Sequence, residues 1–378
     1  MKAGLYFVDG GVACAEGAIY AGCRFFAGYP ITPATSIVEQ MALRLPQVTG
    51  YYVQMEDELA SMAAIIGASW SGGKTMTATS GPGFSLMQEN LGYAYLTETP
   101  VVGVDAQRSG PSTGQATMPG QQDVMQARYG THGDIAPIAF SPWSVQEMFD
   151  FTIHAFNYAE KFRTPTLVMA DGEICYMREP LTIPKSGAFP VLNRKRFTKS
   201  HPRPEEIFLR YEMPRFGDGH NLLVTGSAHR PNGVRDYTPN FHRATIEWIF
   251  KKSQQAGQAL YKEKLDLEVS YLDSAESVVV SFGAAARPAY HAVQTAQKNG
   301  VNVGFARLKT LWPFPEAHLR ALLKDIQRIF VVEMNMGMMV HEVARIACQA
   351  DVISIPKVAG EVHDAKEILK TVMEADAA

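Results

Sequence analysis

The segment Leu59–Trp70 contains almost no polar side chain, and it lies between two short apolar segments, Tyr51–Met55 and Lys74–Thr79. Only Ser61 and Ser69 interrupt its apolar run. A helix that lacks a polar face is expected to be buried on all sides. The segment therefore predicts a helix that packs deep inside the protein between two strands, as helices of α/β folds do.

Segments typical of strands and of helices alternate along the first half of the chain. This alternation predicts a parallel, doubly wound α/β sheet. The expected strands are Arg24–Tyr29, Tyr51–Met55, Lys74–Thr79, Val101–Asp105 and Thr166–Ala170, and the expected helices are Ala13–Cys23, Thr35–Leu45, Leu59–Trp70, Phe84–Thr97 and Val145–Phe162.

From Ser277 onwards a shorter alternation predicts a second, smaller α/β domain. Between the two domains, periodicity is weak until a helix near Arg243–Lys262, and a segment of this length is expected to pack on another part of the protein. We expect a first domain at 1–182, a linker with an excursion at 183–276, and a second domain at 277–378. The expected strands of the second domain are Val278–Ser281, Val301–Arg307 and Arg328–Glu333, and its expected helices are Ala286–Asn299, Pro315–Leu323 and Val340–Ala350.

Composition excludes several classes of protein. The 378 residues suffice for two domains with cores, and a charged fraction of only 19% suggests that some surface is covered by a partner subunit. A net charge of −3 argues against nucleic-acid binding. The sequence contains no run of about 18 apolar residues, so we expect no membrane span. The first residues are too few and too polar for a signal peptide, so we expect a cytoplasmic protein. The cysteines are scattered, without a C-x-x-C pair, and predict no metal or iron–sulfur site in this chain; they are Cys14, Cys23, Cys175 and Cys348.

Four consecutive expected strands are followed by loops whose residues can bind a ligand. The carboxyl ends of parallel strands meet at one edge of the sheet, where α/β proteins bind their ligands. We therefore expect the four loops to form one site. They are Gly28–Pro33, Glu56–Glu58, Thr79–Gly83 and Gln107–Gly114.

Each of these loops also has a simpler interpretation. The loop Thr79–Gly83 either presents backbone N–H groups to an anion or is a tight turn with a serine cap. Arg108 either grips a substrate carboxylate or forms a surface ion pair, and its position among glycines after a buried strand favours the substrate. Thr32 lies between two prolines, which either hold its hydroxyl in a fixed direction or simply form a turn.

Three carboxylates precede the apolar helix, and Glu58 is the most informative of them. Acidic residues in a first turn are favourable for the helix dipole alone. Glu58, however, shares a helical stripe with Met62, Ile65 and Ile66, so the alternative is an acid held away from water, as a proton relay requires. A different motif, Gly217-Asp218-Gly219, follows no buried strand, and we expect a turn there rather than a diphosphate site.

Motifs along nearly the whole chain resemble the α subunit of 2-oxoacid:ferredoxin oxidoreductases, and most closely the 2-oxoglutarate type. They are GYPITPAT (28–35), QMEDELASMAAIIGASWSGGKTMTATSGPGFSLMQE (54–89), QRSGPSTG (107–114), GTHGD (130–134), VTGSAHRPNG (224–233), RLKTLWPFPE (307–316) and VVEMNMG (331–337). The resemblance implies a thiamine-diphosphate-binding fold, with a pyrimidine-binding-type domain followed by a domain similar to the transketolase C-terminal domain. It also implies CoA-dependent oxidative decarboxylation of 2-oxoglutarate to succinyl-CoA with electrons passed to ferredoxin, or the reverse reductive carboxylation.

The same resemblance implies partners and site residues. A separate β subunit would hold the diphosphate with Mg²⁺ and a [4Fe–4S] cluster, in an (αβ)₂-type complex to which γ and δ subunits are further candidates. Glu58 matches the glutamate that contacts N1′ of the aminopyrimidine, and Thr32 and Arg108 match the substrate-side threonine and arginine. The remaining cofactor contacts implied are Tyr29, Pro30, Ser80 and Gly81.

Two departures from the family pattern leave alternatives open. Relatives often read GNEA where this chain has Gly10–Ala13, and NxGQ where it has Asn335–Met338. One alternative is the same chemistry on a branched-chain or aryl 2-oxoacid, and another is a non-catalytic scaffold subunit. A second substrate carboxylate would need an extra cation, for which the candidates are Arg24, Lys74, Arg128 and His132.

Overall fold

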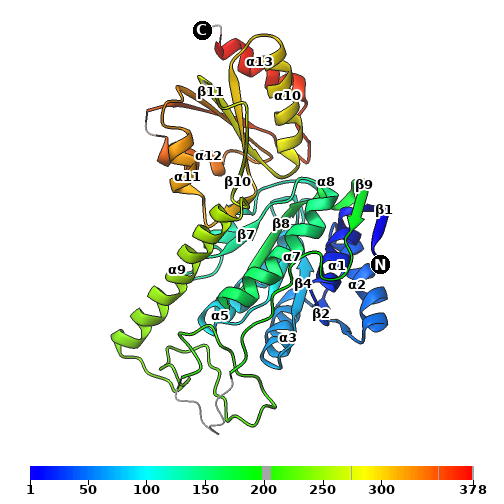
Figure 1. Cartoon of the computed structure of the whole chain (residues 1–378), viewed down its shortest axis with the longest axis vertical. Coiled ribbons are helices and arrows are strands. Elements are labelled where there is room, and N and C mark those ends of the chain that lie inside the picture. Colours follow the sequence, from blue (N-terminus) through cyan, green and yellow to red (C-terminus); the bar gives the residue numbers. More distant parts are fainter. Residues whose placement is uncertain (198–205, 274, 348, 377–378) are drawn as a thin grey trace.

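The computed structural model describes residues 1–197, 206–273, 275–347 and 349–376. Two α/β domains are stacked along the long axis of the molecule, and the long helix α9 (Pro239–Lys262) runs beside the first domain towards the second (Figure 1). No helix within the described ranges combines the length and the apolar character that a membrane span requires.

The first domain is built on a mainly parallel sheet of strand order β13-β7-β8-β5-β4-β2-β3. Only β13 and the short β6, which pairs with the end of β5, are antiparallel to their neighbours. The predicted parallel, doubly wound sheet is therefore confirmed. Its strands are β2 (Phe25–Gly28), β3 (Tyr51–Gln54), β4 (Thr75–Thr79), β5 (Val102–Ser109), β6 (Gln115–Pro119), β7 (Ile138–Phe140), β8 (Thr166–Asp171) and β13 (Thr310–Trp312).

Helices cover both faces of this sheet, with α1 and α7 packed together on one face and α3 and α5 on the other. The helix expected at Phe84–Thr97 is in fact two helices that meet at Met87, so this prediction was wrong about its start and its continuity. The helices are α1 (Gly10–Tyr20), α2 (Thr35–Arg44), α3 (Glu58–Trp70), α4 (Gly81–Leu86), α5 (Gln88–Leu96), α6 (Val124–Tyr129), α7 (Val145–Phe162) and α8 (Gly172–Tyr176).

Helix α1 starts earlier than expected, because Asp9 caps it by accepting a hydrogen bond from Val12 N at 2.9 Å.

The glycine at position 11, where the family pattern has another residue, has a packing explanation. A Cβ at that position would lie 1.9 Å from Ser36 Oγ, so α1 and α2 cross too closely for a side chain. The strands β1 (Gly4–Asp9) and β9 (Arg178–Ile183) were not predicted, and they pair antiparallel beside α1.

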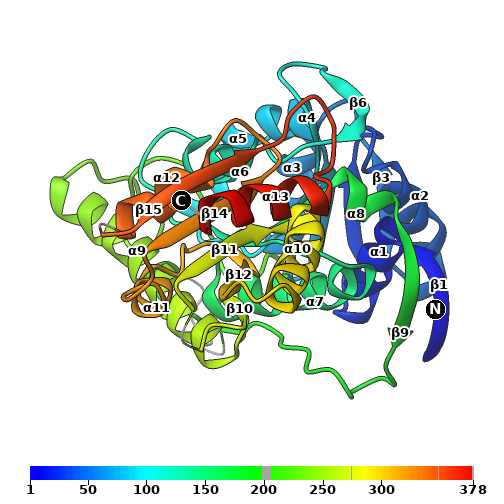
Figure 2. The ribbon, with the colours of Figure 1, turned by 90° about the horizontal axis from the view of Figure 1, so that it is seen from above.

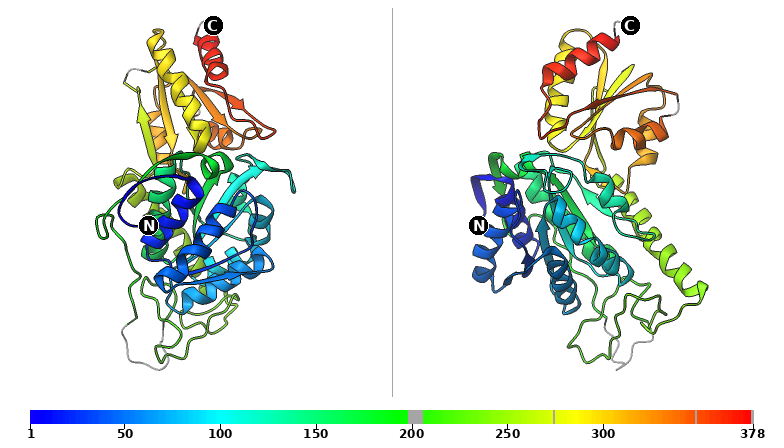
Figure 3. Two further views of the ribbon diagram at one scale, coloured as in Figure 1. Left: turned by 90° about the vertical axis from the view of Figure 1, so that its right-hand side faces the viewer. Right: turned by 180° about the vertical axis from the view of Figure 1, so that it is seen from behind.

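The segment after β9 packs on the first domain, as expected for its length. Arg194 forms a buried ion pair with Glu160 at 2.6 Å and donates to Ser69 O and Gly73 O. Phe208 is buried against Trp70, with ring centroids 6.0 Å apart. Figure 3 shows these irregular segments gathered at the end of the first domain that lies away from the second.

The second domain contains a five-stranded sheet of order β10-β12-β11-β14-β15, in which only β10 is antiparallel. Helices α10 and α13 cover one face, and α11 and α12 cover the other (Figure 2). Strands β10 and β15 and helix α13 were not predicted. The elements are β10 (Leu267–Ser270), β11 (Ser277–Phe282), α10 (Ala286–Lys298), β12 (Val303–Leu308), α11 (Glu316–Leu322), β14 (Arg328–Glu333), α12 (Met339–Ile346), β15 (Asp351–Pro356) and α13 (Ala365–Asp376).

Candidate functional site

The four loops singled out in the sequence lie at one edge of the first sheet. Strands β5, β4, β2 and β3 are consecutive neighbours and run parallel, so their carboxyl ends are side by side. This edge is where open α/β sheets bind ligands. The site is therefore built from four strand ends that are far apart in the sequence.

Glu58 is the first residue of α3, and its side chain points into the protein with a residue exposure of only 3%. Thr79, the last residue of β4, donates a hydrogen bond from Oγ1 to Glu58 Oε1 at 2.9 Å. A Cβ at Gly83 would lie 2.1 Å from that same oxygen, so only glycine lets the start of α4 approach so closely. Asp57 has a different role, because its carboxylate caps α3 by accepting from Ala60 N at 2.7 Å.

The expectation that α3 is buried on all sides was wrong for this chain. Leu59 is 48% exposed, and Ala63 and Gly67 follow it at four-residue spacing on the same exposed face. The opposite face, with Met62 and Ile65, is fully buried. The helix is apolar all round because one face packs on the sheet and the other is an uncovered apolar stripe.

Arg108 and Thr32 are brought into contact by the fold. The Arg108 guanidinium, 93% buried as a residue, donates from Nη1 to the carbonyl oxygen of Thr32 at 2.9 Å. Its Nε has no hydrogen-bond partner among the residues that the structure describes, so one donor of the guanidinium is unused. In the same loop as Thr32, Tyr29 and Pro30 are exposed.

Ser80 and Gly81 lie at the junction of β4 and α4. Ser80 is fully buried, and its hydroxyl makes no hydrogen bond with any described residue, although Ser80 occupies the cap position of α4. Gly81 begins the helix, and a Cβ there would have no neighbour closer than 4.0 Å. This turn, close to Glu58, thus contains a hydroxyl without a hydrogen-bond partner among the described residues, at Ser80, and a backbone that no side chain covers, at Gly81.

A buried carboxyl pair behind the site was not predicted. Asp105 stands beside Thr79 on the neighbouring strand, and the carboxyl group of Asp123, at the start of α6, is close enough to act on its pKa. Burial, together with the charge of Asp123, raises the pKa of Asp105 well above its usual range. Gln107 donates to the Asp123 carboxylate. An aspartate within an otherwise apolar strand was the sequence signal for this pair.

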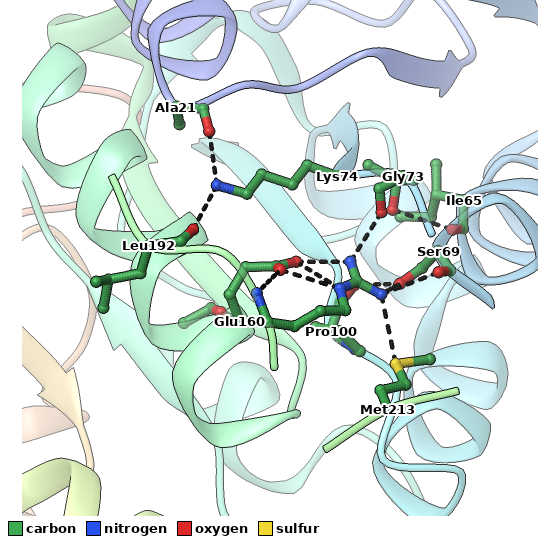
Figure 4. Close-up of polar contacts among 12 residues, drawn as sticks. Ala21, Ile65, Ser69, Gly73, Lys74, Pro100, Glu160, Leu192 and Met213 are labelled. Atoms are coloured by element: carbon green, nitrogen blue, oxygen red, sulfur yellow. Dashed lines mark hydrogen bonds and ion pairs between the residues drawn. The ribbon is translucent and has the colours of Figure 1, made fainter. Parts of the chain in front are cut away.

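Two of the proposed cations, Arg24 and Lys74, are not at the site. They precede β2 and β4 and so lie at the amino ends of the strands, opposite the loops. The Lys74 amine donates to Ala21 O at 2.8 Å and to Leu192 O at 2.5 Å (Figure 4), and burial lowers its pKa to about 8. Lys74 therefore joins the excursion to the first domain.

The other two proposed cations have local partners. Arg128 donates to Ile135 O at 2.5 Å and lies 4.8 Å above the Tyr129 ring. His132 is exposed, with Glu89 Oε2 at 3.5 Å from its Nδ1.

The remaining sequence motifs supply no chemistry in the described parts of the chain. Gly217 and Gly219 adopt left-handed φ values of +94° and +83° in an irregular segment, so the GDG motif is a turn, as expected. Cys14, Cys23 and Cys175 are buried free thiols, and Cys348 lies outside the described residues. Among the described residues, no group of three or more His, Cys, Asp or Glu side chains is arranged to hold a metal ion.

Comparison with known proteins identifies the family. Residues 16–247 match the thiamine-diphosphate-binding domain of pyruvate flavodoxin/ferredoxin oxidoreductases, and residues 275–368 match core domain II of pyruvate:ferredoxin oxidoreductase. Subunit KorA of 2-oxoglutarate synthase from Methanothermobacter marburgensis is 48% identical over 377 residues, which is 97% of this chain and 98% of that subunit. The chain belongs to the 2-oxoacid:ferredoxin oxidoreductase family.

Other relatives of this oxidoreductase chain agree with that assignment. The ketoisovalerate oxidoreductase subunit VorB of the same organism is 33% identical over 97% of both chains. The 2-oxoglutarate:ferredoxin oxidoreductase from Magnetococcus marinus, solved with 2-oxoglutarate, coenzyme A and succinyl-CoA bound, superposes with a TM-score of 0.91 at 32% identity and covers 98% of this chain. The matched region makes up 65% of the longer Magnetococcus chain. A split-gene transketolase, 12% identical with a TM-score of 0.55 over 97% of this chain and 96% of that one, shares the fold. The predicted thiamine-type fold is confirmed.

Proposed function

We propose that this chain is the α subunit of a 2-oxoglutarate:ferredoxin oxidoreductase that is active only together with its β subunit. The complex converts 2-oxoglutarate, coenzyme A and oxidised ferredoxin to succinyl-CoA, CO₂ and reduced ferredoxin, or runs the reverse reductive carboxylation. The observation that carries the proposal is the level of identity along nearly the whole chain. It reaches 48% with three 2-oxoglutarate synthase subunits and is 32–33% with ketoisovalerate oxidoreductase subunits.

The turn between β4 and α4 fits the ring of thiamine diphosphate. The orphaned Ser80 hydroxyl and the bare backbone at Gly81 lie beside the buried Glu58 carboxylate, so a planar, nitrogen-rich ring would find a donor, an acceptor and no obstructing side chain. Tyr29 and Pro30 would contact the ring from the neighbouring strand end. When bound, the cofactor supplies the nucleophilic carbon that attacks the oxo group and holds the electrons left behind by CO₂. The diphosphate, its Mg²⁺ and a [4Fe–4S] cluster belong to the β subunit in this proposal.

With the cofactor bound, Glu58 would face the aminopyrimidine ring and hold a proton towards it. Two contacts hold its carboxyl group in place, namely the Thr79 hydroxyl and the backbone of Gly83. Because both atoms of such a pair are shielded from water, the proton stays between the carboxyl and the ring instead of exchanging with solvent. Asp105 stands beside Thr79 on the next strand, and the raised pKa of its carboxyl group disfavours a second negative charge behind Glu58.

Arg108 and Thr32 orient the substrate. The hydrogen bond from Arg108 to the Thr32 carbonyl fixes the guanidinium, and its unpaired Nε leaves a donor for the 2-oxoacid carboxylate. Charge-assisted hydrogen bonds of this kind are short and directional. The Thr32 hydroxyl, held between Pro30 and Pro33, donates to the oxo group in this proposal.

The β subunit covers the apolar surface that surrounds Glu58. Leu59 on α3, Leu86 on α4 and Tyr29 after β2 are 48%, 51% and 40% exposed. Apolar patches of this kind mark protein interfaces. A partner on this face would bury both the uncovered side of α3 and the open side of the cofactor turn. We propose 1–182 as the pyrimidine-binding-type unit that presents this face, with an (αβ)₂-type complex, ferredoxin as electron acceptor, γ and δ subunits as further candidate partners, and a cytoplasmic location.

The role of Glu58 is tested with Glu58→Gln in the complex co-expressed with the β subunit. Glutamine keeps the size of the side chain but cannot exchange the proton, so the rate should fall by about 10²–10⁴-fold while assembly is unchanged. Glu56→Gln is the matched control, because Glu56 is exposed two residues earlier. An active Glu58→Gln complex would instead support the scaffold alternative.

The substrate is tested by measuring acyl-CoA formation with a panel of 2-oxoacids and a one-electron acceptor. We expect 2-oxoglutarate to be used in strong preference to 2-oxoisovalerate and phenylpyruvate. A preference for either of the latter would assign the chain to the branched-chain or aryl alternative.

A further inference from the structure

Gln121, in the segment between β6 and α6, joins the two domains. It is fully buried, and all of its polar groups are used. Its backbone N and its side-chain Oε1 form a pair of 3.0 Å hydrogen bonds with the O and N of Met334. Its Nε2 donates to Phe282 O and to Asp171 Oδ2, both at 3.1 Å, and its carbonyl accepts from Asn335 Nδ2 at 2.8 Å. One side chain of the first domain thus engages the ends of β11 and β14 in the second domain.

These strand ends form the crevice where a sheet of this kind usually binds a ligand. Strands β11 and β14 are neighbours, and the chain leaves β11 towards β12 on the other side, so the topology reverses between them. Here the protein itself fills the crevice. A Cβ at Gly283 would lie 2.5 Å from Asp171 Oδ2 and 2.6 Å from Gln121 Nε2, which leaves no space for a further group. Glu333 likewise occupies the amino end of α12, where it accepts from Met338 N, Met339 N and Val340 N.

The segment that carries Gln121 is tied to Arg108. Arg108, near the end of β5, is paired with Pro119 on β6, two residues before Gln121. Gln122 then reaches back across the loop, and its Oε1 accepts from Gly110 N at 2.6 Å. Displacement of Gln121 would therefore shift the backbone on which the Arg108 guanidinium stands.

A second contact presses the same hairpin against the second domain. Gly360, in the loop after β15, has a φ of +75°, and a Cβ there would lie 2.3 Å from Met118 Cβ and 2.7 Å from Gln115 Oε1. Both of these residues belong to β6. The hairpin formed by β5 and β6 is thus held from two loops of the second domain.

We propose that Gln121 is a positioning residue for the 2-oxoacid. Gln121 fills the crevice of the second domain and thereby holds the β5–β6 hairpin in place. The hairpin in turn holds Arg108 in the position that substrate binding requires. The second domain is then the platform for the substrate end of the site, not a separate ligand-binding unit. This inference rests on the proposed substrate role of Arg108.

The test compares Gln121→Ala and Gln121→Met in the assembled complex. Methionine keeps the volume of glutamine and fills the crevice, but it makes none of the side-chain hydrogen bonds. We expect the KM for 2-oxoglutarate to rise by about 10-fold or more in both variants, because guanidinium misplacement weakens substrate binding, with a smaller change in kcat and none in thiamine diphosphate affinity. Amide hydrogen exchange over residues 108–120 should become faster. Gln297→Ala is the matched control, since Gln297 also donates to a strand carbonyl, Val303 O, but within the second domain.

The result separates this inference from the proposed function on which it rests. If Arg108→Lys raises the KM for 2-oxoglutarate but both Gln121 variants leave it at the wild-type value, the positioning role is refuted and the substrate role of Arg108 stands. If Arg108→Lys itself leaves the KM unchanged, the proposed site is wrong. Loss of assembly in both Gln121 variants, or unchanged amide exchange in residues 108–120, also refutes the positioning role.

Discussion

The packing at Gly83 against Glu58 allows one substitution to be worked out in detail. A Cβ at this position would lie 2.1 Å from both Glu58 Oε1 and Thr79 Oγ1. Since real carbon atoms do not approach within about 3 Å of such atoms, Gly83→Ala must move the Glu58 carboxyl by about 1 Å. A displacement of about 1 Å can lower a catalysed rate by about 10²-fold. The backbone at Gly83 is helical, so alanine favours α4 by about 0.5–1 kcal/mol, which offsets part of an overpacking cost of about 1–3 kcal/mol.

The measurement is succinyl-CoA formation by the purified complex, together with its melting temperature and its elution volume in gel filtration. We expect Gly83→Ala to lose activity with a loss of stability of at most about 2 kcal/mol and with assembly unchanged. Gly257→Ala is the control, because Gly257 is also helical, on α9, and a Cβ there would come no closer than 3.3 Å to Pro313 Cγ. If Gly83→Ala keeps the wild-type rate, Glu58 does not need the position that the structure gives it, and the relay argument fails.

Three further substitutions test other contacts. Thr79→Val keeps the shape of the side chain but removes the hydrogen bond to Glu58, and a bond to a charged group contributes about 1.5–3 kcal/mol, so kcat should fall by about 10- to 100-fold in steady-state assays. Burial lowers the pKa of Lys74 from 10.5 to about 8, which means that the folded state disfavours the charged amine. Relative to Lys74→Met, the free energy of unfolding of the wild type should therefore fall by up to about 3 kcal/mol as the pH drops from above 10 to below 8; equal pH profiles in calorimetry would contradict this. Arg194→Ala leaves the Glu160 carboxylate buried and unpaired, and should cost about 3–5 kcal/mol of unfolding free energy, measured by denaturant titration.

Local patterns in the sequence predicted the elements that have a clear period and a clear end. Helix α7 runs over Val145–Phe162, as expected, because its apolar stripe is continuous and Ser144 caps it by accepting from Glu147 N. Strand β14 likewise matches Arg328–Glu333. Strand β13 could not be predicted in the same way, because Thr310–Trp312 pairs with β7 of the first domain, a contact that no local pattern encodes.

The site shows the same division between local and long-range information. Periodicity alone placed Glu58 on the stripe of Met62 and Ile65, and the order of the strands implied that the loops carrying Thr32, Glu58 and Arg108 meet at one edge. Periodicity also led to the wrong inference for the other face of α3, because an apolar face that packs on the core and one left for a partner have the same composition.

The order of residues alone dictated the parallel strands and the polar loops at their carboxyl ends, because side-chain periodicity and turn residues act over a few neighbouring positions. Three-dimensional packing decided which charged groups reach that edge. The Lys74 amine, for example, is bound by the carbonyl groups of Ala21 and Leu192, on the side of the sheet opposite the site. Gln121 was placed against β11 and β14 by partners more than a hundred residues away, namely Phe282 and Met334. Such partners are brought together only when two separate sheets have folded and docked, and a period read along one segment carries no information about them.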